Sequence, residues 1–185
     1  MTKMTKCCAP QSALALAERL WRGGKHLALA AVASIIVAAP SLADRGPVTN
    51  LPMPRYVSLK GSEGNARRGP STSHRIDWVF VRRDMPLQVI GEYDNWRQVR
   101  DREGATGWVH YALLSGVRTV IVDYDMVPLR SSPQDGAAVV AHLESGVIAR
   151  LGECAPDWCR VSVDGYRGWL RKTAIWGVDP DEIRD

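Results

Sequence analysis

Short runs of apolar and polar residues, separated by turn residues, fill the chain from residue 55 onward. Aromatic and β-branched residues are frequent in these runs, and none shows the apolar spacing of an amphipathic helix. In the run 96–100 we expect Trp96 and Val99 to point inward and the Arg and Gln residues outward. The pattern predicts an all-β fold. The expected strands are 56–59, 76–81, 87–93, 96–100, 106–110, 118–122, 127–129, 139–143, 147–154, 158–163 and 166–171.

Turn residues separate these runs and give their order along the chain. Tight turns are expected at 61–64, 94–95, 101–104, 155–157 and 164–165, where Gly, Asp and Asn gather. Residues 112–114 and 173–175 each predict one short helical turn. The strand at 118–122 could close the unit that precedes it.

One spaced pattern occurs twice in the chain, about sixty residues apart. Each copy has an arginine, then a tryptophan, then a Gly-Trp pair: Arg67, Trp96, Gly107 and Trp108 in the first, and Arg130, Trp158, Gly168 and Trp169 in the second. Such self-similarity predicts two units of similar shape. A unit of this size protects its strand edges best as a small rolled barrel. We therefore expect units at 55–116 and 117–178, a linker at 44–54 and a C-terminal tail at 179–185.

Residues 1–43 have the pattern of a secretory signal peptide. Five basic residues precede an apolar run at 27–39, and Ser41-Leu42-Ala43 offers a cleavage site with small residues. The apolar run has 13 residues, whereas a membrane span needs about 20. Export to the periplasm is therefore expected, with no stable membrane span after cleavage. A retained N-terminal anchor is the alternative.

Removal of the leader changes the charge of the protein. The whole chain has 24 basic and 20 acidic residues, a net charge of +4. Residues 44–185 hold 19 of each and are neutral, so their charge gives no support to nucleic-acid binding. The charge is unevenly divided, at +3 for residues 44–116 and −3 for residues 117–185. Opposite signs could help the two units dock on each other, or could serve different partners.

Two cysteines, Cys154 and Cys159, follow the leader. Close cysteine pairs in exported proteins usually form disulfides, so we expect this pair to be oxidised. Zinc binding is the competing interpretation. It is disfavoured because no second cysteine pair or nearby histidine completes a site.

The two spaced copies resemble the motifs of the bacterial SH3 domain, a small β-barrel of exported envelope proteins. The first copy carries the fuller set: Asn65, Arg67, Gly69, Pro70, Trp96, Val99, Gly107, Trp108 and Val109. The second copy keeps Arg130 and Pro133 but has Ser131-Ser132 in place of Arg68-Gly69. The resemblance covers nearly all of residues 55–178 and implies two tandem SH3-like barrels.

The resemblance also implies a function. Domains of this family usually bind or position other molecules, and many are attached to cell-wall hydrolases, where they contact peptidoglycan or its peptides. No catalytic domain accompanies them here. We therefore expect a non-catalytic binding module of the cell envelope that contacts peptidoglycan. An adaptor that recognises a periplasmic partner protein is the alternative.

Catalytic and metal-binding constellations are not evident in the sequence. The three histidines after the leader have no metal-ligand spacing, both cysteines are taken up by the expected disulfide, and no Gly-x-Ser-x-Gly elbow occurs. We therefore expect no enzyme activity, no cofactor and no metal.

Aromatic and basic residues of the first copy are the candidate ligand-binding residues. Exposed Tyr93, Trp96 and Tyr111 would form a platform for a peptide or a sugar ring. Arg67 and Arg68 could hold a carboxylate in bidentate fashion. The alternatives are that Arg67 pairs internally with an acidic residue and that Arg68 is solvated.

The tryptophans of both copies could instead have a structural role in the cores. Trp108 and Trp169 are expected in the barrel cores, because each lies at the start of a paired strand. Trp96 and Trp158 follow turns, so a half-exposed position is as compatible with the sequence as a buried one.

Overall fold

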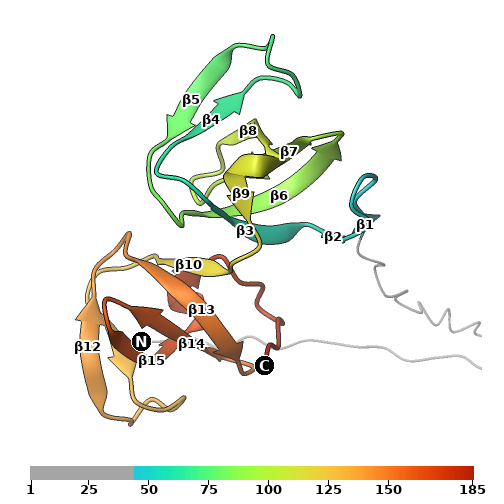
Figure 1. The fold of residues 1–185 in the computed structure, drawn as a ribbon. Coiled ribbons are helices and arrows are strands. Elements are labelled where there is room, and N and C mark those ends of the chain that lie inside the picture. The colour runs from blue at the N-terminus through green and yellow to red at the C-terminus, as the bar shows by residue number, and fades with distance from the viewer. Residues whose placement is uncertain (1–43) are drawn as a thin grey trace, which may run out of the picture. The chain divides into compact units, whose positions relative to one another are not determined.

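The computed structural model describes residues 44–185, and the expected signal peptide lies outside the described residues. Within this range the chain forms two seven-stranded sheets and one two-stranded ribbon (Figure 1). None of the described helices has the length and apolar character needed to cross a membrane.

Residues 55–115 form the first sheet, coloured cyan to yellow in Figure 1. Its strand order is β5-β4-β8-β7-β6-β3-β9, with antiparallel neighbours throughout. One 3₁₀ turn, η1 (Tyr111–Leu113), lies between β8 and β9 along the chain. The strands are β3 (Arg55–Leu59), β4 (Gly64–Arg67), β5 (Ile76–Phe80), β6 (Pro86–Tyr93), β7 (Trp96–Arg100), β8 (Thr106–His110) and β9 (Leu114–Ser115).

The second sheet repeats this arrangement in residues 119–176. Its strand order is β12-β11-β15-β14-β13-β10-β16, which matches the first sheet strand for strand. The 3₁₀ turn η2 (Lys172–Ala174) occupies the position of η1. The strands are β10 (Thr119–Val122), β11 (Val127–Arg130), β12 (Val139–Leu143), β13 (Ile148–Cys154), β14 (Trp158–Val163), β15 (Tyr166–Arg171) and β16 (Ile175–Trp176).

The predicted all-β fold of two SH3-like barrels is thus confirmed, with local differences. Strand β10 pairs with β13 and β16, so the strand expected to close the first unit belongs to the second sheet. Strand β4 was not predicted, because the turn residues of 61–64 lead into it and its own residues carry few apolar side chains.

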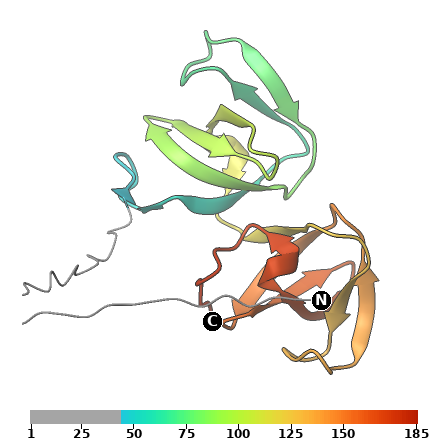
Figure 2. The same cartoon turned by 180° about the vertical axis from the view of Figure 1, so that it is seen from behind.

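A glycine in each barrel allows two strands to approach closely. A Cβ on Gly107 would lie 2.9 Å from the Cβ of Ala66, and one on Gly168 would lie 2.6 Å from the carbonyl oxygen of Arg130. At these points β4 meets β8 and β11 meets β15. In the view of Figure 2, the hairpin of β4 and β5 extends away from the other strands of the first sheet. The Gly-Trp pairs of the sequence therefore mark a required close contact.

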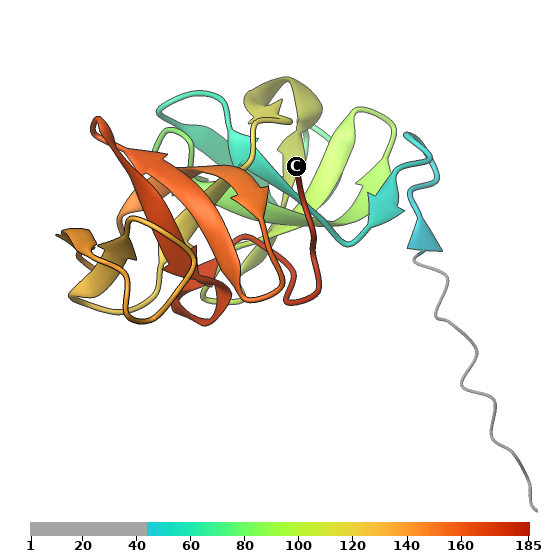
Figure 3. The same ribbon diagram turned by 90° about the horizontal axis from the view of Figure 1, so that it is seen from below.

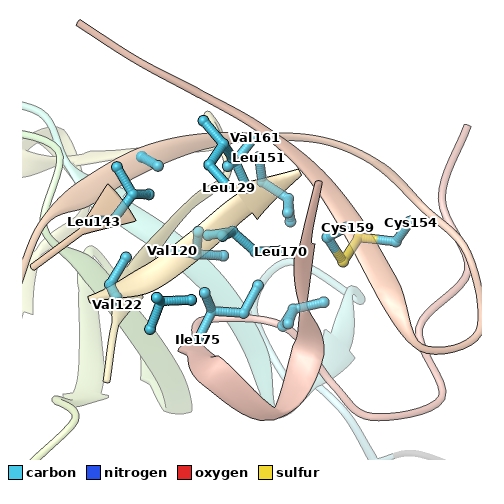
Figure 4. Packing of buried hydrophobic residues seen from close by; sticks show 13 residues of the cluster. Val120, Val122, Leu129, Leu143, Leu151, Cys154, Cys159, Val161, Leu170 and Ile175 are labelled. Carbon is cyan, nitrogen blue, oxygen red and sulfur yellow. A yellow bond between two sulfur atoms is a disulfide. The ribbon is translucent and has the colours of Figure 1, made fainter. Parts of the chain in front are cut away.

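Each barrel has its own hydrophobic core. The first contains Leu59, Ala66, Phe80, Leu87, Val89, Val99 and Val109. The second core is larger and includes Val120, Val122, Leu129, Leu143, Leu151, Val161, Leu170 and Ile175 (Figure 4). Burial of these side chains is the main favourable contribution to the stability of so small a fold.

The expected disulfide between Cys154 and Cys159 is confirmed. The two residues face each other across β13 and β14, with their Cα atoms 4.1 Å apart. Both cysteines are buried at the end of the second core (Figure 4). The bond therefore ties the two strands of this hairpin together beside the core.

The segment expected as an extended linker has structure of its own. Strands β1 (Asp44–Arg45) and β2 (Pro52–Met53) pair to form a small hairpin. Glu92 of β6 holds its turn, since the carboxylate accepts hydrogen bonds from the Thr49 amide at 2.9 Å and the Thr49 hydroxyl at 2.7 Å. Arg55 donates a further hydrogen bond to the same carboxylate at 2.6 Å.

The electrostatic environment of Glu92 lowers the pKa of its carboxyl group. Burial by itself raises this pKa, but the hydrogen bonds from Thr49, Arg55 and the Val48 amide outweigh burial and bring the pKa to about 2, from an ordinary value of 4.5. The folded state therefore favours the ionised form.

The C-terminal residues also pack against the second barrel rather than forming a free tail. Cys154 and Arg184 exchange backbone hydrogen bonds, and the amine of Lys172 donates to the carbonyl of Pro180 at 3.0 Å. Arg118 donates to both carboxylate oxygens of Glu182, at 3.0 and 2.9 Å. Figure 3 shows this dark red segment beside the orange strands.

Replacement of Glu92 by Gln should remove a pH-dependent part of the stability. A depressed carboxyl pKa stabilises the fold above pH 4.5, and this contribution is lost as the pH falls toward 2. The wild type should thus exceed Glu92→Gln in unfolding free energy by roughly 3 kcal/mol at neutral pH, and the difference should shrink as acid is added. Denaturant unfolding at a series of pH values measures it. Glu103→Gln, at an exposed position, is the control, and a pH-independent difference would contradict the assignment.

Removal of the disulfide should destabilise the protein moderately. The closed loop is short, with a sequence separation of 5, so the double variant Cys154→Ala, Cys159→Ala should lose about 2 kcal/mol of unfolding free energy. Chemical denaturation of the variant, compared with oxidised and reduced wild type, tests this. Equal denaturation midpoints for oxidised and reduced wild type would show that the bond contributes nothing.

Candidate functional site

Each barrel places a tryptophan opposite a basic or titratable side chain. Trp96 of β7 pairs with His110 of β8, and Trp158 of β14 pairs with Arg171 of β15. These are equivalent positions, because the two sheets have the same strand order. The cross-strand pairs are therefore the common element of the two candidate sites.

Four ring-bearing side chains gather in the first barrel, and we call them the aromatic cluster: Tyr93, Trp96, His110 and Tyr111. The His110 ring lies edge-on to Trp96 with centroids 5.3 Å apart, and 5.0 Å from the ring of Tyr111. Tyr93 is the cross-strand partner of Trp96 on β6. The cluster thus joins the three aromatic residues that the sequence singled out.

Exposure differs sharply within the aromatic cluster. Trp96 is 8% exposed, whereas Tyr93 is 61% and Tyr111 is 51% exposed. The cluster thus combines one buried tryptophan with two tyrosines that face the solvent. Exposed aromatic faces with a polar hydroxyl are suited to peptide and sugar ligands.

The second barrel has a groove of about 260 Å³ beside its tryptophan, which we call the Trp158 groove. Its lining is largely apolar and includes Met126, Pro128, Arg130, Asp135, Trp158 and Arg171. Most of its lining comes from β11, the residues before it and η2, and the loop between β11 and β12 contributes Asp135.

Charged side chains define one wall of the Trp158 groove. The Arg171 guanidinium stacks on the Trp158 ring, 4.6 Å from its centroid, and its Nε donates to Asp135 Oδ1 at 2.9 Å. The hydrogen bond from Arg171 is the main reason why the pKa of the Asp135 carboxyl lies below its ordinary value. The pair therefore stays ionised and holds the guanidinium against the ring.

Arg67 has a structural role in its loop. Its Nη1 donates to the carbonyls of Thr72 at 3.0 Å and His74 at 2.6 Å. Arg130 makes the matching contact in the second barrel, to the carbonyl of Ala137 at 2.9 Å. Arg67 is thus bound internally, but its acceptors are backbone carbonyls and not the acidic side chain of the alternative given above.

Arg68 is exposed and separate from the aromatic cluster. Its Nε lies 3.4 Å from Asp77 Oδ2, and Arg75 reaches the other oxygen of the same carboxylate at 2.7 Å. Because such surface pairs are weak, Arg68 remains free to meet a ligand. The structure therefore groups Tyr93, Trp96 and Tyr111, but it does not join Arg68 to them.

The expectations for the tryptophans were partly wrong. Trp108 and Trp169, expected in the cores, are half-buried, whereas Trp96 and Trp158 are buried at 8% and 7% exposure. Arg97, expected to point outward, is also buried, because it shares an inward face with Val99. Trp96 is three residues from Val99 and so lies on the other face, covered by His110.

Three residues of the candidate sites were missed in the sequence: His110, Arg171 and Asp135. His110 lies two residues after Trp108, and Arg171 lies two residues after Trp169. Because side chains alternate along a strand, the sequence could have placed each of them on the same face as that tryptophan. Asp135 has no such signal, because its partner Arg171 is 36 residues away. Within residues 44–185 no group of three or more His, Cys, Asp or Glu could hold a metal ion.

Comparison with known proteins bears on this architecture. A model of the bacterial SH3 domain matches the chain twice, over residues 60–116 and 123–177. No curated protein matches the chain.

Two solved structures from Trichomonas vaginalis resemble it, those of NlpC2 and NlpC1, at 14% and 13% sequence identity. The NlpC2 match covers 68% of this chain and 50% of the other, with a TM-score of 0.32. For NlpC1 the values are 75%, 50% and 0.31. The chain thus spans about half the length of these structures, and such low scores carry no argument about its activity.

The family match has a firmer basis. Its two regions together exceed half of the chain, and each falls on one of the two sheets that share a strand order. The resemblance recognised in the motifs is thereby confirmed, and the chain belongs to the bacterial SH3 domain family.

Proposed function

We propose that this protein is an exported, non-catalytic binding module of the cell envelope that contacts peptidoglycan or its peptides. Bacterial SH3 domains are typically binding modules and often bind components of the cell wall. The aromatic cluster of the first barrel is the proposed contact surface. Export through the leader would place it in the periplasm.

The observation that carries the proposal is the exposure of Tyr93 and Tyr111. Both rings lie more than half exposed beside a buried Trp96. Tyr124 and Tyr166 are exposed as well, but only Tyr93 and Tyr111 combine exposure with a place around Trp96. Rigid, exposed rings are typical of recognition surfaces.

An adaptor function is the second candidate, and one observation favours it. Strand β5 lies at the edge of the first sheet, and Ile76 and Val79 on it are each 43% exposed. An unpaired edge with apolar side chains can accept a strand from a protein partner. This surface is separate from the aromatic cluster, so the two candidates can be tested independently.

Sedimentation with purified peptidoglycan sacculi tests the proposal. The protein should pellet with sacculi, and the double variant Tyr93→Ser, Tyr111→Ser should bind about tenfold more weakly or worse, because it loses two stacking rings. Both rings are exposed, so the variant should fold as the wild type does. Trp96 is left intact, since truncation of a buried tryptophan would destabilise the barrel by about 3–5 kcal/mol.

Tyr166→Ser is the matched control for this experiment. Tyr166 is 53% exposed and lies at the tip of the β14–β15 hairpin, outside the aromatic cluster. Its variant should pellet as the wild type does. If wild-type protein stays in the supernatant, wall binding is refuted under those conditions. If the double variant and the control pellet equally, the aromatic cluster is not the contact surface.

A further inference from the structure

A pocket of about 360 Å³ opens in the first barrel beside the aromatic cluster. Two arginines line it, Arg55 of β3 and Arg97 of β7, together with the hydroxyl-bearing side chains of Tyr111 and Ser115. We call it the Arg55–Arg97 pocket. Its size lies near the lower end of the range for pockets that hold small ligands.

The charged lining of this pocket is entirely basic. No acidic residue is among its lining residues. The neighbouring acid, Glu92, has a side chain that is 0% exposed and accepts hydrogen bonds from Thr49 and Arg55. Two guanidinium groups are thus balanced by one buried carboxylate, which leaves a net positive charge beside the pocket.

The two guanidinium groups are held in place before any ligand arrives. Arg97 Nη1 donates to the carbonyls of Asp94 and Trp96, both at 2.8 Å, and its side chain is 9% exposed. Arg55 is fixed through Nη2 by its hydrogen bond to Glu92. Groups that are already oriented lose little conformational freedom on binding, which favours affinity.

One nitrogen of Arg55 lacks a hydrogen-bond partner. Nη1 is buried and finds no acceptor among residues 44–185. A buried donor without an acceptor is unfavourable. Nη1 is thus the nitrogen of Arg55 that stays without a partner while Nη2 is bound to Glu92. A ligand oxygen that accepted from it would satisfy this donor.

The remaining lining favours an organic acid over an inorganic ion. Leu51, Val57 and Leu114 supply apolar surface, and hydroxyl groups of Tyr111 and Ser115 supply donors. A carboxylate attached to a short apolar group matches this combination, since guanidinium groups bind carboxylates in bidentate fashion.

Tyr111 belongs both to this pocket and to the aromatic cluster. Tyr111 is therefore the residue at which the pocket and the aromatic cluster meet. We propose that the Arg55–Arg97 pocket binds the free terminal carboxylate of a peptide whose preceding residues lie on the aromatic cluster. This inference takes only one point from the proposed function, namely that the peptide comes from the cell wall.

Gly116 allows a test that leaves the arginines intact. It lines the pocket, and a Cβ built on it meets nothing within 4 Å. Gly116→Glu would add a competing carboxylate beside the two guanidinium groups, whereas Gly116→Gln adds the same bulk without charge. Gly136→Glu is the location control, because Gly136 of the second barrel also has open space around its Cβ.

The probes are N-acetyl-alanyl-alanine with a free carboxylate and its C-terminal amide, each as the D,D and the L,L form. Affinities are measured by NMR titration of the purified protein. The carboxylate should bind about tenfold more tightly than the amide. Gly116→Glu should lose this preference, and Gly116→Gln and Gly136→Glu should keep it.

Three outcomes would overturn the inference: equal affinity for carboxylate and amide, no binding of either, or a Gly116→Glu variant that binds the carboxylate like Gly116→Gln. Chirality distinguishes the source of the ligand, since wall peptides end in D-residues and proteins in L-residues. If only the L,L peptide shows the carboxylate preference, the pocket is a carboxylate site, but the cell wall is not the source of its peptide. Because sacculi are absent here, failure of the pocket and failure of wall binding are separate results.

Discussion

Both barrels depend on one close contact between strands. Where β4 meets β8 and β11 meets β15, the absence of a Cβ on Gly107 and Gly168 lets the strands touch. This approach allows a sheet of short strands to curl over a small core, which a unit of about sixty residues needs for stability. It also fixes β8 and β15, the strands that carry His110 and Arg171 to the candidate sites.

A single buried carboxylate, that of Glu92, connects the N-terminal hairpin to the first barrel. Glu92 joins three segments that are distant in sequence: the N-terminal hairpin through Thr49, strand β3 through Arg55, and its own strand β6. It also holds Arg55 at the edge of the Arg55–Arg97 pocket. Stability of the hairpin and charge of the pocket are therefore linked through one residue.

Equivalent positions in the two barrels carry different chemistry. The tryptophan of the first barrel is flanked by His110 and exposed tyrosines, and that of the second by an Arg171–Asp135 ion pair. This local difference accompanies opposite net charges in residues 44–116 and 117–185. A repeated fold with divergent sites is consistent with two barrels that present different ligand surfaces.

The sequence by itself determined the strand pattern and the repeat. Strands 96–100, 106–110, 139–143, 158–163 and 166–171 were predicted with the bounds that the structure has, because turn residues and β-rich runs are local signals. The disulfide was also readable, since its cysteines are close in sequence. Only the tertiary structure decided which tryptophans are buried, where β10 pairs, and that Thr49 meets Glu92 from 43 residues away. Such contacts join segments that are distant in sequence and share no periodic pattern, so they can be identified only from the tertiary structure.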